Sequence, residues 1–323
     1  MASLSLLDLA TVVIGGTTSH ALAETTEMAK VVEEVGMNRL WVAEHHGMPG
    51  VASSAPAVLL AHLAAHTSTL RIGAGGVMLP NHASLIVAEQ FGTLEALHPG
   101  RIDLGIGRAP GTDLRTARAL GRGDAGHFPE QLIELLGYFT GDSELLAMPG
   151  RGLMPEIWLL GSSTYSAQLA GMLGLPFSFA YHFSPEPLDA ALEAYRSNFR
   201  PSSVLEGPRV MIGVSVLCAP STEEAIWLAG PSRLAMALQR QGRPSTLPSP
   251  EEAAGYAYSD SQLAEIERSA ASHVVGDPEL VTAGLGALAA RTGAEELMIS
   301  TRVFSLEDRI RSVRLLAESW RAS

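Results

Sequence analysis

The sequence predicts a (β/α)8 barrel, also called a TIM barrel, with insertions at the carboxyl-terminal ends of its strands. Two observations support this α/β fold class. Short apolar runs alternate strictly with amphipathic helical stretches, and eight apolar runs of this kind occur along the chain. Alternating β and α elements form a parallel sheet, and eight of them suggest a closed barrel. A doubly wound open sheet is the competing architecture.

The expected elements follow one another without an internal repeat or a linker. The first helix follows Ser19 as a candidate cap and ends before Gly36, and Pro56 opens the second helix at its first turn. The expected strands cover residues 4–10, 39–45, 70–79, 101–109, 156–162, 177–182, 209–219 and 296–301. The expected helices cover residues 20–35, 56–66, 84–98, 128–139, 164–173, 185–199, 221–238, 277–291 and 304–320.

Two stretches depart from this alternation. Residues 107–126 form a long loop rich in Gly and Arg, and residues 239–259 are rich in Pro, Ser, Gly and Glu. Residues 260–271 add a further short helix. We therefore expect one domain, 1–323, with a lid or insertion at 239–275. Long insertions in a compact domain are often lids, although a disordered surface excursion is the alternative.

Composition excludes several classes of protein. The 323 residues are 46% hydrophobic and 17% charged, which is enough apolar material for a large core. The net charge is 22 − 34 = −12, without the basic footprint of a nucleic-acid-binding protein. No basic leader and no membrane-length apolar run occur, so we expect a cytoplasmic protein. The single cysteine, Cys218, excludes an intramolecular disulfide and a Cys-rich zinc site, and its apolar surroundings predict a buried structural thiol.

Polar and glycine-rich motifs gather where the expected strands end, and the starts of the same strands carry few such groups. The catalytic groups of a barrel lie at these carboxyl-terminal ends. This asymmetry predicts an enzyme. The motifs are Glu44-His45-His46, Gly75-Gly76, Gly107-Arg108, Gly161-Ser162-Ser163 and Tyr181-His182.

The histidine pair follows the second expected strand. Adjacent strand residues point to opposite sides, so His45 and His46 cannot jointly chelate a metal. No His-Glu-x-x-His run occurs either, and we expect no metal site. One of the pair is expected at the barrel mouth as a hydrogen-bond donor or proton carrier. The alternative is that both histidines merely fix a loop.

Arg108 and the segment 161–166 together predict a phosphate site. A guanidinium suits a phosphate, and the amides and hydroxyls at a helix start bind anions. Each feature also has an ordinary explanation: Arg108 could pair with Glu44, Asp103 or Asp113, and a Ser or Thr could simply cap its helix. Their occurrence on neighbouring strands favours phosphate.

Three further features need partners or close packing. Gly75-Gly76 inside an apolar strand indicates either a flat ligand nearby or a bulge. Gly105-x-Gly107 lacks the third glycine of a dinucleotide-binding fingerprint, so a Rossmann assignment fails. Asp8, an acid among apolar residues, is either a site residue or the partner of an arginine.

At this point the motifs resemble a known family, the bacterial-luciferase-like flavin-dependent monooxygenases, and in particular their single-polypeptide "group 1" oxidoreductases. Order and spacing match closely across residues 1–130, and the later segments extend the resemblance to nearly the whole chain. The matching segments are residues 41–46, 52–56, 75–82, 88–91, 99–111, 161–166, 176–183 and 295–301.

The resemblance implies a function. Members use reduced FMN and O2, through a flavin C4a-(hydro)peroxide, to oxygenate an organic substrate; here we expect an aldehyde, a ketone or an intermediate of secondary metabolism. No pyridine-nucleotide motif is visible, so a separate NAD(P)H:flavin reductase would supply the reduced FMN. A homodimer is the family habit. One branch uses the deazaflavin F420 for hydride transfer, and a non-catalytic flavin-binding, subunit-like protein is the remaining alternative.

The resemblance also assigns roles to single residues. His45 matches the active-site histidine beside the flavin, and Gly75-Gly76 matches a non-prolyl cis peptide against its ring system. Gly107 stands where the light-emitting α subunit carries a reactive cysteine, which leaves light emission open. The residues expected to contact the cofactor are Gly75, Gly76, Gly107, Arg108, Ser162, Ser163 and Ser166.

Overall fold

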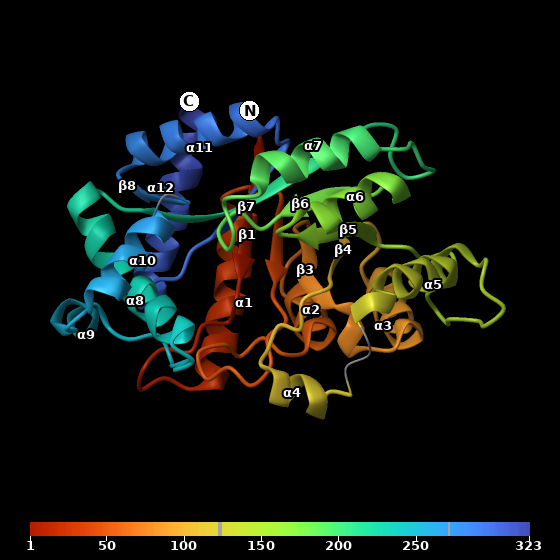
Figure 1. Cartoon of the computed structure of the whole chain (residues 1–323), viewed down its shortest axis with the longest axis horizontal. Coiled ribbons are helices and arrows are strands. Elements are labelled where there is room, and N and C mark those ends of the chain that lie inside the picture. Colours follow the sequence, from red (N-terminus) through yellow and green to blue (C-terminus); the bar gives the residue numbers. More distant parts are fainter. Residues whose placement is uncertain (122–124, 271) are drawn as a thin grey trace.

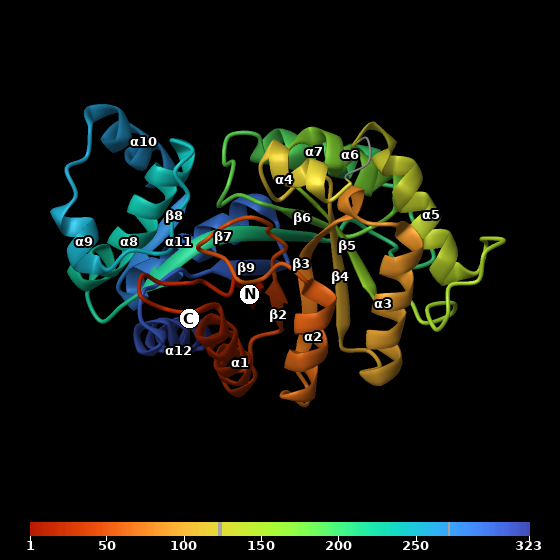
Figure 2. The same cartoon turned by 90° about the horizontal axis from the view of Figure 1, so that it is seen from below.

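In the computed structural model, which describes residues 1–121, 125–270 and 272–323, the strands pair in parallel and close into a barrel (Figures 1 and 2). Pairing runs from β1 to β7 in chain order, then to β9, and β9 pairs with β1. The closed barrel is confirmed against the open sheet. The strands are β1 (Ser3–Asp8), β2 (Arg39–Val42), β3 (Arg71–Met78), β4 (Ile102–Gly107), β5 (Glu156–Gly161), β6 (Phe177–Phe179), β7 (Val210–Cys218), β8 (His273–Gly276) and β9 (Glu296–Ser300).

The helical patterns of the sequence are helices of the structure. Helix α1 begins a little earlier than expected, because Thr17 and not Ser19 is its cap: Thr17 Oγ1 accepts a hydrogen bond from the His20 amide (3.2 Å). The nine helices that match predicted ones are α1 (Thr18–Glu34), α2 (Pro56–Ala65), α3 (Ser84–Leu97), α5 (Phe128–Thr140), α6 (Thr164–Leu173), α7 (Leu188–Asn198), α8 (Thr222–Arg240), α11 (Pro278–Thr292) and α12 (Leu306–Ala322).

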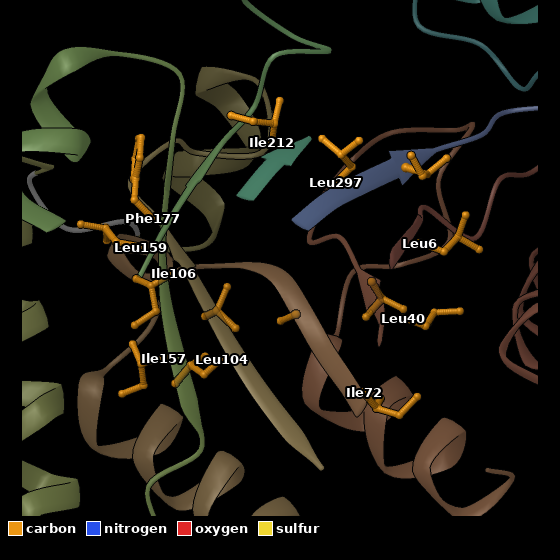
Figure 3. Close-up of a cluster of buried hydrophobic side chains, with 14 of the residues drawn as sticks. Leu6, Leu40, Ile72, Leu104, Ile106, Ile157, Leu159, Phe177, Ile212 and Leu297 are labelled. Carbon is orange, nitrogen blue, oxygen red and sulfur yellow. The ribbon is translucent and has the colours of Figure 1, made fainter. Parts of the chain in front are cut away.

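Alternate residues of the strands point to opposite sides of the barrel wall. Outward side chains pack against the surrounding helices, and Figure 3 shows part of this apolar cluster, with Leu6 and Leu40 among the labelled residues. Their neighbours Leu7 and Trp41 belong to a separate cluster inside the barrel, where Trp41 meets Trp158 edge to face at 5.9 Å between ring centroids. The barrel interior is therefore a packed core, and any ligand must bind at one end.

The insertions contain more regular structure than predicted. The expected loop at 107–126 holds α4 (Leu114–Ala119) and the short 3-10 turn Ala125–His127, while its residues 122–124 lie outside the described residues. The expected lid holds α9 (Pro250–Gly255), which was not predicted, and α10 (Asp260–Ala270), which matches the short helix predicted at 260–271; Ala271 itself is also outside the described residues. Strand β8 was not predicted. It pairs with Ser215–Cys218 of β7, on the edge opposite β9 and past the stretch of β7 that pairs with β6.

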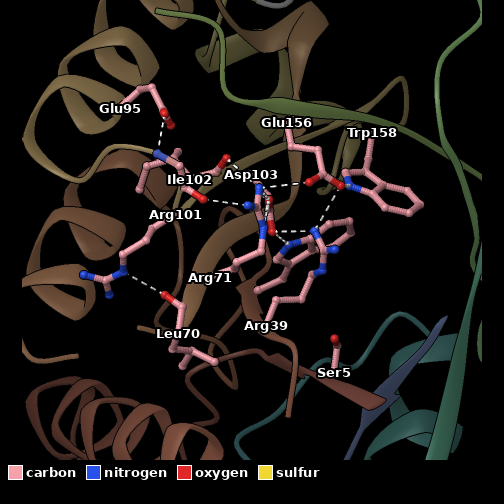
Figure 4. A network of polar contacts seen from close by, with 12 residues as sticks. Ser5, Arg39, Leu70, Arg71, Glu95, Arg101, Ile102, Asp103, Glu156 and Trp158 are labelled. Atoms are coloured by element: carbon pink, nitrogen blue, oxygen red, sulfur yellow. Dashed lines mark hydrogen bonds and ion pairs between the residues drawn. The ribbon is translucent and has the colours of Figure 1, made fainter. Parts of the chain in front are cut away.

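The amino-terminal ends of the strands hold a buried network of ion pairs (Figure 4). Arg39, the first residue of β2, donates two hydrogen bonds to Glu296 (2.8 and 3.1 Å) and one to Asp103 (2.8 Å). Glu156, the first residue of β5, pairs with Arg71 at 3.0 Å. The expectation that strand starts carry few polar groups was wrong. Each charge is isolated in the sequence, and only barrel closure brings them together.

Two open questions about single residues are answered by their surroundings. Asp8 is structural: its carboxylate accepts hydrogen bonds from the Ala10 amide (2.6 Å) and Thr25 (3.0 Å), and it lies 3.3 Å from the Arg309 guanidinium. Cys218 is buried as predicted, and burial raises the pKa of its thiol to about 11. No helix in the described part of the chain is long and apolar enough to cross a membrane.

Candidate active site

Glu44, which follows β2, fixes the local structure at the carboxyl-terminal end of the barrel. Its buried carboxylate accepts hydrogen bonds from His46 Nε2 (2.9 Å), His82 Nε2 (2.9 Å) and the Met78 amide (3.0 Å). Burial opposes ionisation of Glu44, but these bonds outweigh it and lower its pKa. His46 is thus committed to a carboxylate, in the supporting role that the sequence predicts for it.

His45 has a different environment from its neighbour. Its Nδ1 lies 3.2 Å from the carbonyl oxygen of Gly111. Burial and the charge of Arg302 lower the pKa of His45, although the Gly111 contact and Glu44 act in the opposite direction. The imidazole is therefore neutral near pH 7, with the Nδ1 proton donated to a carbonyl. That arrangement leaves Nε2 as a proton acceptor beside the cavity that His45 lines.

The peptide bond between Gly75 and Gly76 is cis, as the resemblance implies. The β3–β4 register shifts between Gly75 and Val77, so the bulge that the sequence allowed is present as well. A side chain would not fit at either glycine: a Cβ on Gly75 would lie 2.7 Å from Trp41, and one on Gly76 would lie 2.5 Å from Leu160. Internal packing alone requires both glycines.

The predicted phosphate site is assembled from two neighbouring strands. The guanidinium of Arg108, just past β4, stacks over the ring of Tyr165 at 4.2 Å. Tyr165 lies in the first turn of α6, whose cap residue Ser163 makes no side-chain capping bond. Ordinary N-capping by Ser163 is thus ruled out, and its hydroxyl is not used by the helix. The amides of this turn and the guanidinium of Arg108 form one potential anion site.

The three carboxylates considered above as alternative partners of Arg108 each have other contacts. Glu44 and Asp103 belong to the groups described above, and Asp113 caps α4 by accepting bonds from two backbone amides (2.8 and 2.9 Å). The remaining predicted contacts lie nearby: Ser162 and Ser163 begin the turn before α6, and Ser166 is buried in its first turn. Gly107 ends β4, where a Cβ would lie 3.0 Å from the sulfur of Met78.

Three residues of this end were not among the predicted site residues. His182 follows β6, and its buried Nδ1 meets no partner in the described residues. Arg302 follows β9 and lines the cavity beside His45. His273 opens β8 and lines a second cavity, which Arg302 also borders. Burial lowers the pKa of all three, that of His273 to about 4. The strand-end rule was the available signal for Arg302.

The chain after α8 crosses the cavity beside His45. Pro244 and Ser245 line this cavity, and Leu247 is hydrogen-bonded on both sides to the loop after β1, through Val12 (2.8 Å) and Ile14 (2.8 Å). This part of the predicted lid is therefore attached to the barrel rather than being a surface excursion. Within the described ranges, no group of three or more His, Cys, Asp or Glu side chains is arranged to hold a metal.

Comparison with known proteins identifies the family. The family profile described as luciferase-like monooxygenase matches residues 4–296. The chain belongs to this family. A luciferase-like monooxygenase of Escherichia coli is 44% identical over 96% of this chain and 95% of its own length, and Bacillus subtilis YvbT is 48% identical over 98% and 96%. The crystal structure of apo-MsnO8 superposes with a TM-score of 0.92 at 37% identity, covering 100% and 99% of the two chains.

More distant structures share the fold of this chain, and their own cofactors differ. One is the oxygenating constituent of 3,6-diketocamphane monooxygenase from Pseudomonas putida in complex with FMN (TM-score 0.73, 18% identity, 100% and 99% coverage). Another is an F420-dependent secondary alcohol dehydrogenase in complex with an F420-acetone adduct (TM-score 0.71, 14% identity, 99% and 99% coverage). At these identities the likeness is one of fold. Family membership makes the chain an oxidoreductase.

Proposed function

We propose that this chain is an FMN-dependent monooxygenase that receives reduced FMN from a separate NAD(P)H:flavin reductase and oxygenates an organic substrate with O2. The observation that carries the proposal is the pairing of two features at one barrel end. Arg108 lies over the first turn of α6, where the Ser163 hydroxyl is unused, and His45 faces a neighbouring cavity as a neutral imidazole. The first feature suits a phosphate and the second suits proton transfer.

The residues present fit FMN. Arg108, Ser163 and the α6 amides would hold its phosphate, and the backbone at Gly75 and Gly76 would face its ring system. Reduced FMN, when bound, supplies the electrons that allow one atom of O2 to enter the substrate and the other to leave as water. His45 Nε2 would accept or return a proton beside the reacting atoms. Leu9, Met48, Val51, Ala235 and Pro244 would exclude water from the cavity.

Anaerobic titration with reduced FMN, and separately with reduced F420, tests the cofactor. We expect binding of FMN, and tight binding of F420 alone would contradict the proposal.

Admission of isotopically labelled O2 with aldehydes, ketones and aromatic polyketides should then place the label in a product. If the purified protein consumed NAD(P)H in the presence of FMN and without added reductase, the proposal of a separate reductase would be wrong. Sedimentation analysis checks the proposed homodimer.

A further inference from the structure

Arg302, which follows β9, has a buried donor group without a described acceptor. Its Nε is buried and meets no hydrogen-bond acceptor in residues 1–121, 125–270 and 272–323. Arg302 also borders two cavities, one shared with His45 and the other with His273 and Arg233. A buried N–H group without an acceptor is unfavourable, because it loses hydration and gains no compensating contact.

One further positive charge, that of Arg233, borders a cavity together with Arg302. Arg233, in α8, has no ion pair with any carboxylate that the structure describes. Burial, together with the charges of Arg233 and His182, lowers the pKa of His273. Neither cavity has an aspartate or glutamate among its described lining residues. In a chain with a net charge of −12, two arginines that border cavities without a carboxylate require an explanation.

The flavin phosphate cannot supply the negative charge if it binds at Arg108. In barrel order, β9 is four strands from β4 whichever way the wall is followed, so Arg302 and Arg108 lie across the mouth from each other. His45, after β2, lies between them, two strands from each. A group held by Arg302 would thus be next to His45 and opposite the phosphate site, where the molecule to be oxygenated must lie.

We infer that Arg302, supported by Arg233, binds the carboxylate of the organic substrate. The planar guanidinium matches a carboxylate through two parallel hydrogen bonds. Leu9, Met48, Val51, Ala235 and Pro244 give the cavity beside His45 an apolar part next to the polar Gln239 and Ser245, so the substrate is a small acid with an apolar portion and with its reacting atom near His45. This inference rests on the proposed monooxygenase function, because it names the class of molecule that is oxygenated.

Calorimetry of the protein loaded with reduced FMN under nitrogen tests the inference without turnover. The probes are butyrate, hexanoate and phenylacetate, each against its primary amide. We expect at least one acid to bind about tenfold or more tightly than its amide, since a tenfold ratio is about 1.4 kcal/mol and one charged hydrogen bond contributes that much. Arg302→Met should abolish the preference, Arg302→Lys should retain part of it, and Arg233→Met should weaken it.

The control is Arg314→Met, at an exposed arginine that pairs with Glu34 at 2.8 Å; it should leave the preference unchanged. Thermal unfolding verifies that each variant is folded. Equal affinities for acid and amide, no binding of any acid, or an unchanged preference in Arg302→Met each overturn the inference. So does a loss of FMN affinity in Arg302→Met with acid binding intact, because Arg302 would then serve the cofactor. A protein that prefers acids but binds no FMN contradicts the proposed function alone.

Discussion

The two ends of the barrel differ in whether their arginines have carboxylate partners. At the amino-terminal end, Arg39, Arg71 and Arg209 each face carboxylates at 3.0 Å or less. At the carboxyl-terminal end, Arg302 and Arg233 border cavities with no carboxylate among their described lining residues. The same residue type therefore stabilises the fold at one end and remains available to a ligand at the other. Completeness of pairing, rather than abundance of polar groups, distinguishes the end where we propose that ligands bind.

Breaking the paired end should have the largest effect. Replacing Arg39 with Met leaves Asp103 and Glu296 buried without their shared cation. We expect the free energy of unfolding to fall by about 3–5 kcal/mol in denaturant titration, the cost of removing one partner from a buried pair. The matched Arg314→Met, at a pair whose side chains are 51% and 62% exposed, should cost less than about 1 kcal/mol. Similar losses in both variants would remove the distinction between buried and exposed pairs.

Adding positive charge to the unpaired end should also destabilise the fold. Burial, with Arg233 and His182, lowers the pKa of His273 from 6.5 to about 4. Between these values the unfolded chain binds the proton and the folded chain does not, so stability falls as the pH drops from 6.5 to 4. The loss approaches about 3 kcal/mol near pH 4. His273→Asn should flatten this part of the stability–pH profile, whereas His20→Asn, at an exposed site, should not.

Removing the proton acceptor at the mouth should affect chemistry and not folding. With His45→Ala we expect the yield of oxygenated product to fall about a hundredfold or more, the usual contribution of a general acid–base group. Affinity for reduced FMN should stay within a few-fold, measured by anaerobic fluorescence titration. His46→Ala serves as the comparison, because His46 bonds to Glu44 rather than facing the cavity. Unchanged product yield in His45→Ala would exclude it from the mechanism.

The phosphate side of the mouth should give the smallest and most selective effect. Arg108→Met should weaken FMN binding about tenfold, by the loss of a charged hydrogen bond, while leaving the affinity for riboflavin nearly unchanged because riboflavin has no phosphate. Equal weakening of both ligands would mean that the substitution disturbs the stacking of Arg108 on Tyr165 instead.

Local sequence patterns predict the barrel strands of this protein but not the contacts between residues that are far apart in the sequence. The eight barrel strands were predicted because each is a continuous apolar run, and His45 was singled out because a strand end is a local feature. Strand β8 was missed, because these four residues become a strand only where β7 extends past β6. The ion network and the unpaired Nε of Arg302 were missed for a similar reason. Whether a charged side chain has a partner depends on residues far away in the sequence, which only the folded barrel brings close.

The closure of the barrel between β7 and β9 has a consequence for how such a protein diversifies. The excursion from residue 219 to β8 leaves the far end of β7 and returns alongside that same half-strand. The hydrogen bonds of the closed wall are made without it. Outside Leu247, which is hydrogen-bonded to the loop after β1, this stretch can therefore change in length without breaking the pairing of β7 with β9. Mutation can thus change the choice of substrate while the rest of the enzyme is inherited intact.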